Sequence, residues 1–273
     1  MLETPRLREA LEKLSRFISS GKEPSKKHST LDSLFTGTPQ KAFQNVEVDV
    51  AYLVAPSVHR VPLYFDLPHE VLQGTMCIVT PPPQRKYKDV VLRLSEGGWK
   101  DVFQRVKKVI DTKKLDMKFS DPVAVRALAK SFDHFVVVDA KTYPKQLTGE
   151  FIGHQRVPIW VSQRGGFAQS VRKAARTVVV PRRGHNCVSC LVGHTGLSLD
   201  ELQENVEQFL NKLTSHPQGA TPDSILHVRV AGKDCSGRRA TLTIFCHQFE
   251  IPQGISEERD GEDGPKRKKA KKG

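Results

Sequence analysis

The middle of the chain alternates between short apolar runs and helical patterns, and this alternation restricts the possible folds more than any other feature of the sequence. Residues 75–79 predict a short buried strand that ends before Pro81, Pro82 and Pro83. Helices are expected at about 99–110, 122–131 and 142–151, and strands at 135–138 and 157–161. Strands that alternate with helices favour an α/β arrangement around a parallel sheet.

Strand patterns dominate on both sides of this region. Val46, Val48 and Val50 alternate with polar residues, and the later strands are expected at about 58–65, 177–181, 186–192, 224–231 and 240–246. A first helix begins at Thr4-Pro5, and a basic helix at about 167–176 follows Gly165-Gly166. The capping box from Ser198 to Glu201 predicts one more helix, with a buried apolar stripe.

Residues 151–199 contain no Asp or Glu, although the chain carries 30 of them. Seven basic residues fall in this window: Arg156, Arg164, Arg172, Lys173, Arg176, Arg182 and Arg183. Guanidinium groups without competing carboxylates are what a phosphate-facing surface requires. A solvated charged face on a basic protein is the alternative. The window favours contact with nucleic acid.

The composition agrees with this interpretation. The formal net charge is +13 and the sequence pI is about 9.6, in the range that is typical of nucleic-acid-binding domains. Five cysteines without a regular spacing favour a reducing compartment, and neither a secretory signal nor a membrane span is expected. We therefore expect a soluble intracellular protein.

The end of the chain predicts a nuclear-import signal. A basic cluster follows an acidic, glycine-containing stretch, and its members are Lys266, Arg267, Lys268, Lys269, Lys271 and Lys272. The alternative is a generic basic tail that adds non-specific RNA affinity. Residues 251–273 as a whole are expected to be a disordered tail.

Four motifs in order resemble the ribosomal protein L1 family. The first is Lys41-Ala42-Phe43-Gln44 leading into the strand at Val46, and the second is Leu67-Pro68-His69. The third is Phe132-Asp133-His134-Phe135 with Asp139, and the last is Val192-Gly193-His194-Thr195-Gly196 followed by Leu202 and Asn205. Together they extend over most of the chain, from about residue 41 to 245.

The resemblance implies a two-domain fold. Residues 41–75 and 160–250 would form a discontinuous α+β sandwich that binds RNA, with a Rossmann-like α/β domain, residues 76–159, inserted within it. Residues 1–40 would form an N-terminal helix and a linker.

The resemblance also implies a non-enzymatic role. Arg156-Val157-Pro158 and the Val-Gly-His-x-Gly motif are most similar to nucleolar ribosome-assembly factors. We expect precursor ribosomal RNA and ribosome-assembly proteins as partners, and a monomer outside the particle. A structural stalk protein of the large ribosomal subunit is the alternative.

Residues that match the family's RNA-contacting positions form the candidate site. Phe43 would pack on a sugar or base beside Lys41, Gln44 and Lys233, while Ser236 and Gly237 would let the backbone approach phosphate. Arg172, Lys173, Arg176, Arg182 and Arg183 would add phosphate contacts if they lie on the same side. Here Lys233-Asp234-Cys235 replaces the family's Thr-Met, and Asp234 is expected to face phosphate unfavourably.

Other sites are weaker alternatives. His185, Cys187, Cys190 and His194 could suggest zinc, but side chains three apart on a strand point to opposite faces, so no metal is expected. Gly165-Gly166 before a helix could hold a phosphate of RNA, or of a nucleotide in an α/β enzyme. Asp133, Asp139 and His69 could act as acids or bases, but nothing places them in one pocket. We expect no catalytic set and no cofactor, and expect Asp133 to fix a strand end.

Overall fold

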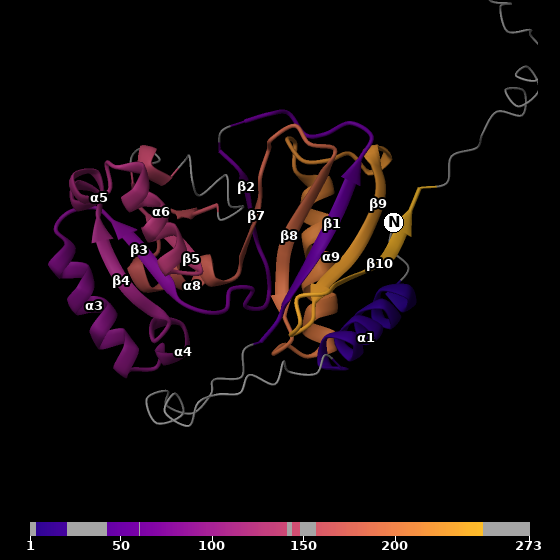
Figure 1. Ribbon diagram of the computed structural model, residues 1–273, viewed down its shortest axis with the longest axis horizontal. Helices are drawn as coiled ribbons and strands as arrows, with labels where there is room; N and C mark the ends of the chain where they lie inside the picture. Colours follow the sequence, from indigo (N-terminus) through magenta and orange to yellow (C-terminus); the bar gives the residue numbers. More distant parts are fainter. Residues whose placement is uncertain (1–3, 21–42, 60, 141–143, 148–156, 248–273) are drawn as a thin grey trace, which may run out of the picture.

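The computed structural model describes residues 4–20, 43–59, 61–140, 144–147 and 157–247 of the chain. They form two four-stranded sheets and a two-stranded ribbon, with helices packed on the sheets (Figure 1). The chain is therefore a mixed α/β protein, as the sequence predicts. None of the described helices combines the length and the apolar character that a membrane crossing requires.

The first sheet is antiparallel and has the strand order β10-β9-β1-β8. Its strands are β1 (Asn45–Tyr52), β8 (Cys187–His194), β9 (Ile225–Lys233) and β10 (Arg239–Cys246). β1 lies between β8 and β9, so the sheet combines an early segment of the chain with much later ones. This discontinuous assembly is the one that the family resemblance implies.

Two helices cover one face of this sheet (Figure 1). α1 (Thr4–Ser20) contacts β9 and β10, and α9 (Leu199–Ser215) contacts β8 and α1. Their apolar stripes are buried at these contacts: Leu7, Leu11, Leu14 and Ile18 on α1, and Leu202, Val206, Phe209, Leu210 and Leu213 on α9. The predicted capping box is present, because Ser198 Oγ accepts from Glu201 N and the Glu201 carboxylate accepts from Ser198 N.

The second sheet is parallel and has the order β4-β3-β5-β6. Its strands are β3 (Met76–Thr80), β4 (Val106–Asp111), β5 (His134–Val138) and β6 (Ile159–Val161). The helices of this unit are α3 (Gln84–Glu96), α4 (Lys100–Phe103), α5 (Thr112–Lys118), α6 (Pro122–Ser131) and α8 (Phe167–Ala175). The alternation of strands and helices in the sequence therefore predicts this arrangement correctly.

One expected element in this unit is wrong, and one helix was missed. The helix expected at 99–110 is only the short α4, and the strand β4 follows it. Val106, Val109 and Ile110 fit a helical stripe as well as a strand, because a short apolar run does not distinguish the two. The long helix α3 was not predicted, although Tyr87 and Val91 are buried on it at helical spacing.

The ribbon joins the two sheets. It pairs β2 (Leu63–Asp66) with β7 (Thr177–Val180) in antiparallel register. The domain boundary expected at about residue 160 falls inside β6, which pairs with β5, and α8 contacts both strands. The parallel unit therefore continues through α8. Of the helix expected at 142–151, the described part is the single turn η1 (Lys145–Leu147).

Candidate nucleic-acid interface

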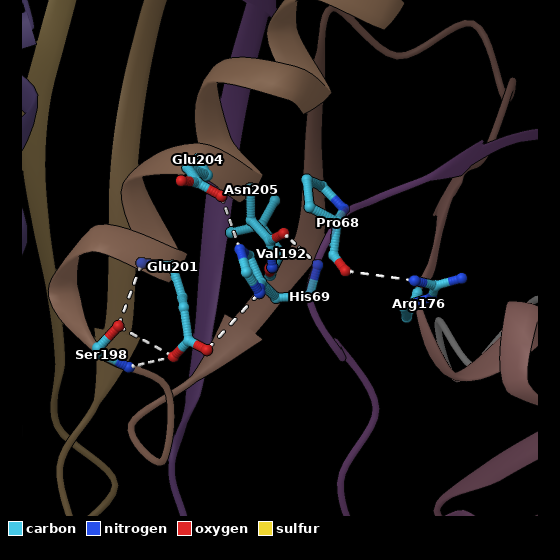
Figure 2. A network of polar contacts seen from close by, with 8 residues as sticks. All are labelled: Pro68, His69, Arg176, Val192, Ser198, Glu201, Glu204 and Asn205. Atoms are coloured by element: carbon cyan, nitrogen blue, oxygen red, sulfur yellow. Dashed lines mark hydrogen bonds and ion pairs between the residues drawn. The ribbon is translucent and has the colours of Figure 1, made fainter.

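A buried asparagine connects two of the sequence motifs. Asn205, on α9, is fully buried, and its side-chain oxygen accepts from the His69 backbone N–H at 3.1 Å. Its amide nitrogen donates to the Val192 carbonyl oxygen at 2.9 Å (Figure 2). The segment that leads towards the second sheet is thereby fixed to the end of β8.

The three residues considered as acids or bases lie in separate surroundings. The His69 ring contacts Glu204 at 2.7 Å and Glu201 at 3.6 Å (Figure 2). Asp133 precedes β5 and accepts from the Thr75 backbone N–H and hydroxyl at 2.8 and 2.9 Å, so it fixes a strand end as expected. Asp139 follows the opposite end of β5, with a φ of 50°. These positions do not form one catalytic pocket.

Phe43 lies at the end of the first sheet where β1 begins. Its side chain is 45% exposed, and its ring centroid is 5.6 Å from that of His194. Gln44 and Thr195 pair through their backbones, with the Thr195 N–H donating to the Gln44 carbonyl at 2.9 Å. A side chain at Gly196 would meet the Phe43 ring at about 3.0 Å. The end of β8 and the loop after it therefore contact the aromatic ring, while nearly half of the Phe43 side chain stays exposed.

The β9–β10 hairpin turn contains an inward-facing acid. The Asp234 side chain is fully buried, and its Oδ1 accepts from the backbone N–H groups of Ser236 and Arg238 and from the Ser236 hydroxyl. Its Oδ2 accepts from Arg238 Nε at 2.8 Å, and these bonds lower the pKa of Asp234 to about 2. The expectation that Asp234 faces phosphate is wrong, because both oxygens bond within the turn.

Strand register brings the turn and Phe43 to the same end of the first sheet. Asn45 lies opposite His194, Val46 opposite Gly232, and Arg239 opposite Lys233. In Figure 1 this is the lower end of the sheet. Lys233, Ser236 and Gly237 are exposed there, and Gly237 has a φ of 84°, which favours glycine.

Two cations at this end were missed by the sequence prediction. Arg238 pairs with Asp234, and Arg239 Nη2 lies 2.7 Å from Asp49 and 3.0 Å from Glu47. Lys233 forms no ion pair with a described residue and keeps its charge available. The turn from Gly232 to Arg239 is predicted from the sequence, but its internal bonds are not. Asp234 could have indicated them, since an Asp side chain in a turn commonly bonds the backbone two residues further on.

The basic window does not form one surface. Arg182 is only 6% exposed, and its guanidinium donates to the Val61 carbonyl and to the Gln218 side chain. These bonds hold the Arg182 guanidinium within the protein, and its phosphate contact stays a prediction. Arg183 is half-buried and lines, with Phe43, a cleft of about 1410 Å3. This cleft lies between residues of β1 and β8 and the starts of β4 and β5.

The basic residues of α8 lie elsewhere. Arg172 and Lys173 are exposed, while Arg176 is half-buried and donates to the Pro68 carbonyl at 3.4 Å (Figure 2). Lys173 and Arg164 line a second, smaller hollow. Lys41, Arg156 and the cluster at 266–272 lie outside the described residues.

The cysteines of β8 are separated as the strand geometry predicts. Cys187 is exposed and Cys190 is buried, so their side chains lie on opposite faces. Burial raises the pKa of the Cys190 thiol, which disfavours the thiolate that binds metal. His194 is 4% exposed, and its burial, with a smaller effect of the Arg105 charge, lowers its pKa to about 4. Within the described ranges no group of three metal-ligating side chains is present.

Comparison with known proteins gives one family. The model of the ribosomal protein L1p/L10e family matches residues 5–234. A Schizosaccharomyces pombe protein that carries a provisional name as a ribosome biogenesis protein is 29% identical over 57% of the chain and 42% of its own length. The large ribosomal subunit protein uL1 of Drosophila melanogaster is 29% identical over 33% of the chain and 43% of its own length. The chain thus matches less than half of either relative.

Proposed function

Since the chain belongs to the ribosomal protein L1p/L10e family, we propose that it is a non-enzymatic, RNA-binding ribosome biogenesis factor. It binds precursor ribosomal RNA within a pre-ribosomal particle in the nucleolus. The name of the fission yeast relative supports a role in ribosome biogenesis. The net charge of +13 supports an RNA partner.

The observation that carries the proposal is the convergence of Phe43 and the β9–β10 hairpin at one end of the first sheet. Phe43 offers a half-exposed aromatic surface, on which a base or sugar stacks. Lys233 and the exposed backbone at Ser236 and Gly237 are close to that end and contact phosphates. Because Asp234 is turned inward, the hairpin presents no free carboxylate to the RNA.

The second candidate is a structural protein of the large ribosomal subunit. The match to the fruit fly ribosomal protein favours it. The two candidates differ in where the protein resides, because a structural subunit sediments with translating polysomes and an assembly factor sediments with precursor particles. Sucrose-gradient fractionation followed by immunoblotting distinguishes them.

Crosslinking of the protein to RNA in living cells, followed by sequencing, tests the main proposal. We expect crosslinks in precursor ribosomal RNA, including spacer sequences that mature ribosomes lack. A Phe43→Ala variant should lose most of these crosslinks while it remains folded. Crosslinks restricted to mature ribosomal RNA, together with sedimentation in polysomes, would support the structural role instead.

A further inference from the structure

α8 carries a basic stripe on its exposed face. Residues 169, 172, 173 and 176 follow the helical spacing i, i+3, i+4 and i+7, and Phe167, Val171 and Ala174 are buried on the opposite face. Arg172 and Lys173 are exposed, and so is Arg164, which lies shortly before the helix begins. We call Arg164, Arg172 and Lys173 the α8 stripe.

The α8 stripe lacks ion-pair partners in the part of the chain that the structure describes. None of its three cations forms an ion pair with a described residue, and the sequence contains no acid from 151 to 199. Asp66 is the single carboxylate among the described residues that line the neighbouring hollow with Arg164 and Lys173. Arg172 also lies four residues before Arg176, and like charges at this helical spacing repel one another, which an anionic partner would offset.

Helix stabilisation does not explain the whole stripe. Arg172 and Lys173 lie in the last turn of α8, where cations interact favourably with the helix dipole. Arg164 lies beside the opposite end, before the N-cap Gly166, where the dipole disfavours a positive charge. A polyanion that extends along the helix accounts for all three residues.

The Arg172 side chain lies over an aromatic ring. Its guanidinium lies 5.1 Å from the centroid of the Trp99 ring, which stabilises it by a cation–π contact. A stacked guanidinium keeps its N–H edge available, and that edge matches the oxygens of a phosphate group. The contact therefore favours one orientation of a side chain that can bind phosphate.

The α8 stripe is separate from the Phe43 end of the first sheet. Phe43 lines the large cleft, whereas Arg164 and Lys173 line the smaller hollow, and the two share one lining residue, Thr177. The ribbon contributes to both, through Val179 to the cleft and through Tyr64 to the hollow. An RNA that reaches both places must extend past the ribbon.

We propose that the α8 stripe is a second RNA-binding surface, which holds phosphates of the RNA backbone independently of Phe43. The inference rests on the proposed function, since it requires an RNA partner. Phosphate contacts carry no base specificity, so this surface contributes salt-dependent affinity, whereas stacking on Phe43 contributes affinity that depends little on salt. Two separate contacts fix the orientation of the inserted parallel unit relative to the RNA.

A salt titration tests the inference on a transcript of the precursor ribosomal RNA that the full chain binds. The variant carries Arg164→Gln, Arg172→Gln and Lys173→Gln together. We expect the slope of log Kd against log salt to decrease by about 0.7–0.9 for each lost contact, or about 2 to 3 in total. The effect should add to that of Phe43→Ala, because separate sites are energetically independent.

The matched control removes two arginines and one lysine from α3, as Arg85→Gln, Lys88→Gln and Arg93→Gln. These side chains are exposed on the helix that contacts the edge strand β4. We expect the control to leave the slope close to that of the unsubstituted protein. An equal decrease in both variants would attribute the effect to net charge and overturn the inference.

Two other outcomes also overturn the inference. An unchanged slope in the stripe variant would show that the α8 stripe does not hold phosphates of the RNA. RNA binding by the Phe43→Ala variant still tests the proposed function separately. An unchanged slope on RNA combined with lost binding to poly-glutamate would assign the α8 stripe to an acidic protein. Thermal unfolding of each variant establishes that the substitutions leave the fold intact.

Discussion

The ring of Phe43 lies 5.6 Å from the ring of His194, and this contact joins the candidate RNA-binding end of the first sheet to the segment that leads to the second. His194 Nδ1 accepts from the Gly196 N–H at 3.1 Å, and its Nε2 lies 2.6 Å from the side-chain amide of Gln73. The Gln73 carbonyl oxygen is in turn 2.6 Å from His134 Nε2, at the start of β5. One buried imidazole therefore supports Phe43 and also holds the crossing segment.

Replacing Phe43 should weaken RNA binding without changing its salt dependence. A base stacked on an aromatic side chain contributes about 1–3 kcal/mol to binding. Phe43→Ala should therefore make the free energy of RNA binding less favourable by about 1–3 kcal/mol at every salt concentration. The slope against salt should remain, because no phosphate contact is lost. Leu92→Ala is the control, since it removes an apolar side chain that is 61% exposed on α3. Normal RNA binding by folded Phe43→Ala would move recognition away from this end of the sheet.

His194 should make stability depend on pH below about 6.5. The folded protein holds its pKa near 4, below the ordinary value of 6.5, so the unfolded chain binds more protons between these values. Stability is then complete at neutral pH and decreases as the pH falls towards 4, by at most about 3 kcal/mol. Urea unfolding at several pH values measures this decrease. The His194→Gln variant should show a smaller decrease, and an identical pH profile in both proteins would contradict the prediction.

Removing the Asn205 side chain should destabilise the fold. Asn205→Ala leaves the His69 N–H and the Val192 carbonyl without their buried partner, at a cost of about 2–4 kcal/mol. Chemical denaturation measures the loss. Asn211→Ala on the same helix removes an exposed amide and should change stability by less than about 0.5 kcal/mol. Equal effects of the two substitutions would show that the link between the two motifs contributes little.

Most of the fold follows from local patterns. The capping box at Ser198, the alternation around Val48 and the apolar stripes of α1 and α9 each predict the element that is present, because each reports local burial. β4 was mistaken for a helix because its local pattern does not distinguish the two, whereas α3 was missed although Tyr87 and Val91 lie at helical spacing. Whether Val109 belongs to a helix or to a parallel strand is decided by its pairing with Ile78 of β3, which the local sequence does not contain.

The candidate site is predicted less completely, because side-chain direction depends on distant partners. Phe43 and Lys233 are 190 residues apart, and only the register of β1, β8 and β9 brings them to one end. Arg182 counted as a phosphate contact in the sequence, but Val61 and Gln218 occupy its donors. The Asp234 carboxylate is expected from the sequence to disfavour RNA, but it pairs with Arg238 within its own turn. Charge alone does not distinguish a structural cation from an available one.

Deleting residues 264–273 should redistribute the protein from the nucleus to the cytoplasm. This segment lies outside the described residues and outside the stretch that the family model matches, so its loss should leave the fold intact. It contains Lys266, Arg267, Lys268, Lys269, Lys271 and Lys272, a cluster typical of import signals. Fluorescence microscopy of tagged full-length and truncated chains measures the change, and a variant with all six residues changed to Gln should match the deletion.

Addition of an unrelated import signal to the truncated chain should restore nucleolar accumulation, since RNA binding retains the protein there. Unchanged nucleolar accumulation of the truncated chain would show that import depends on another segment.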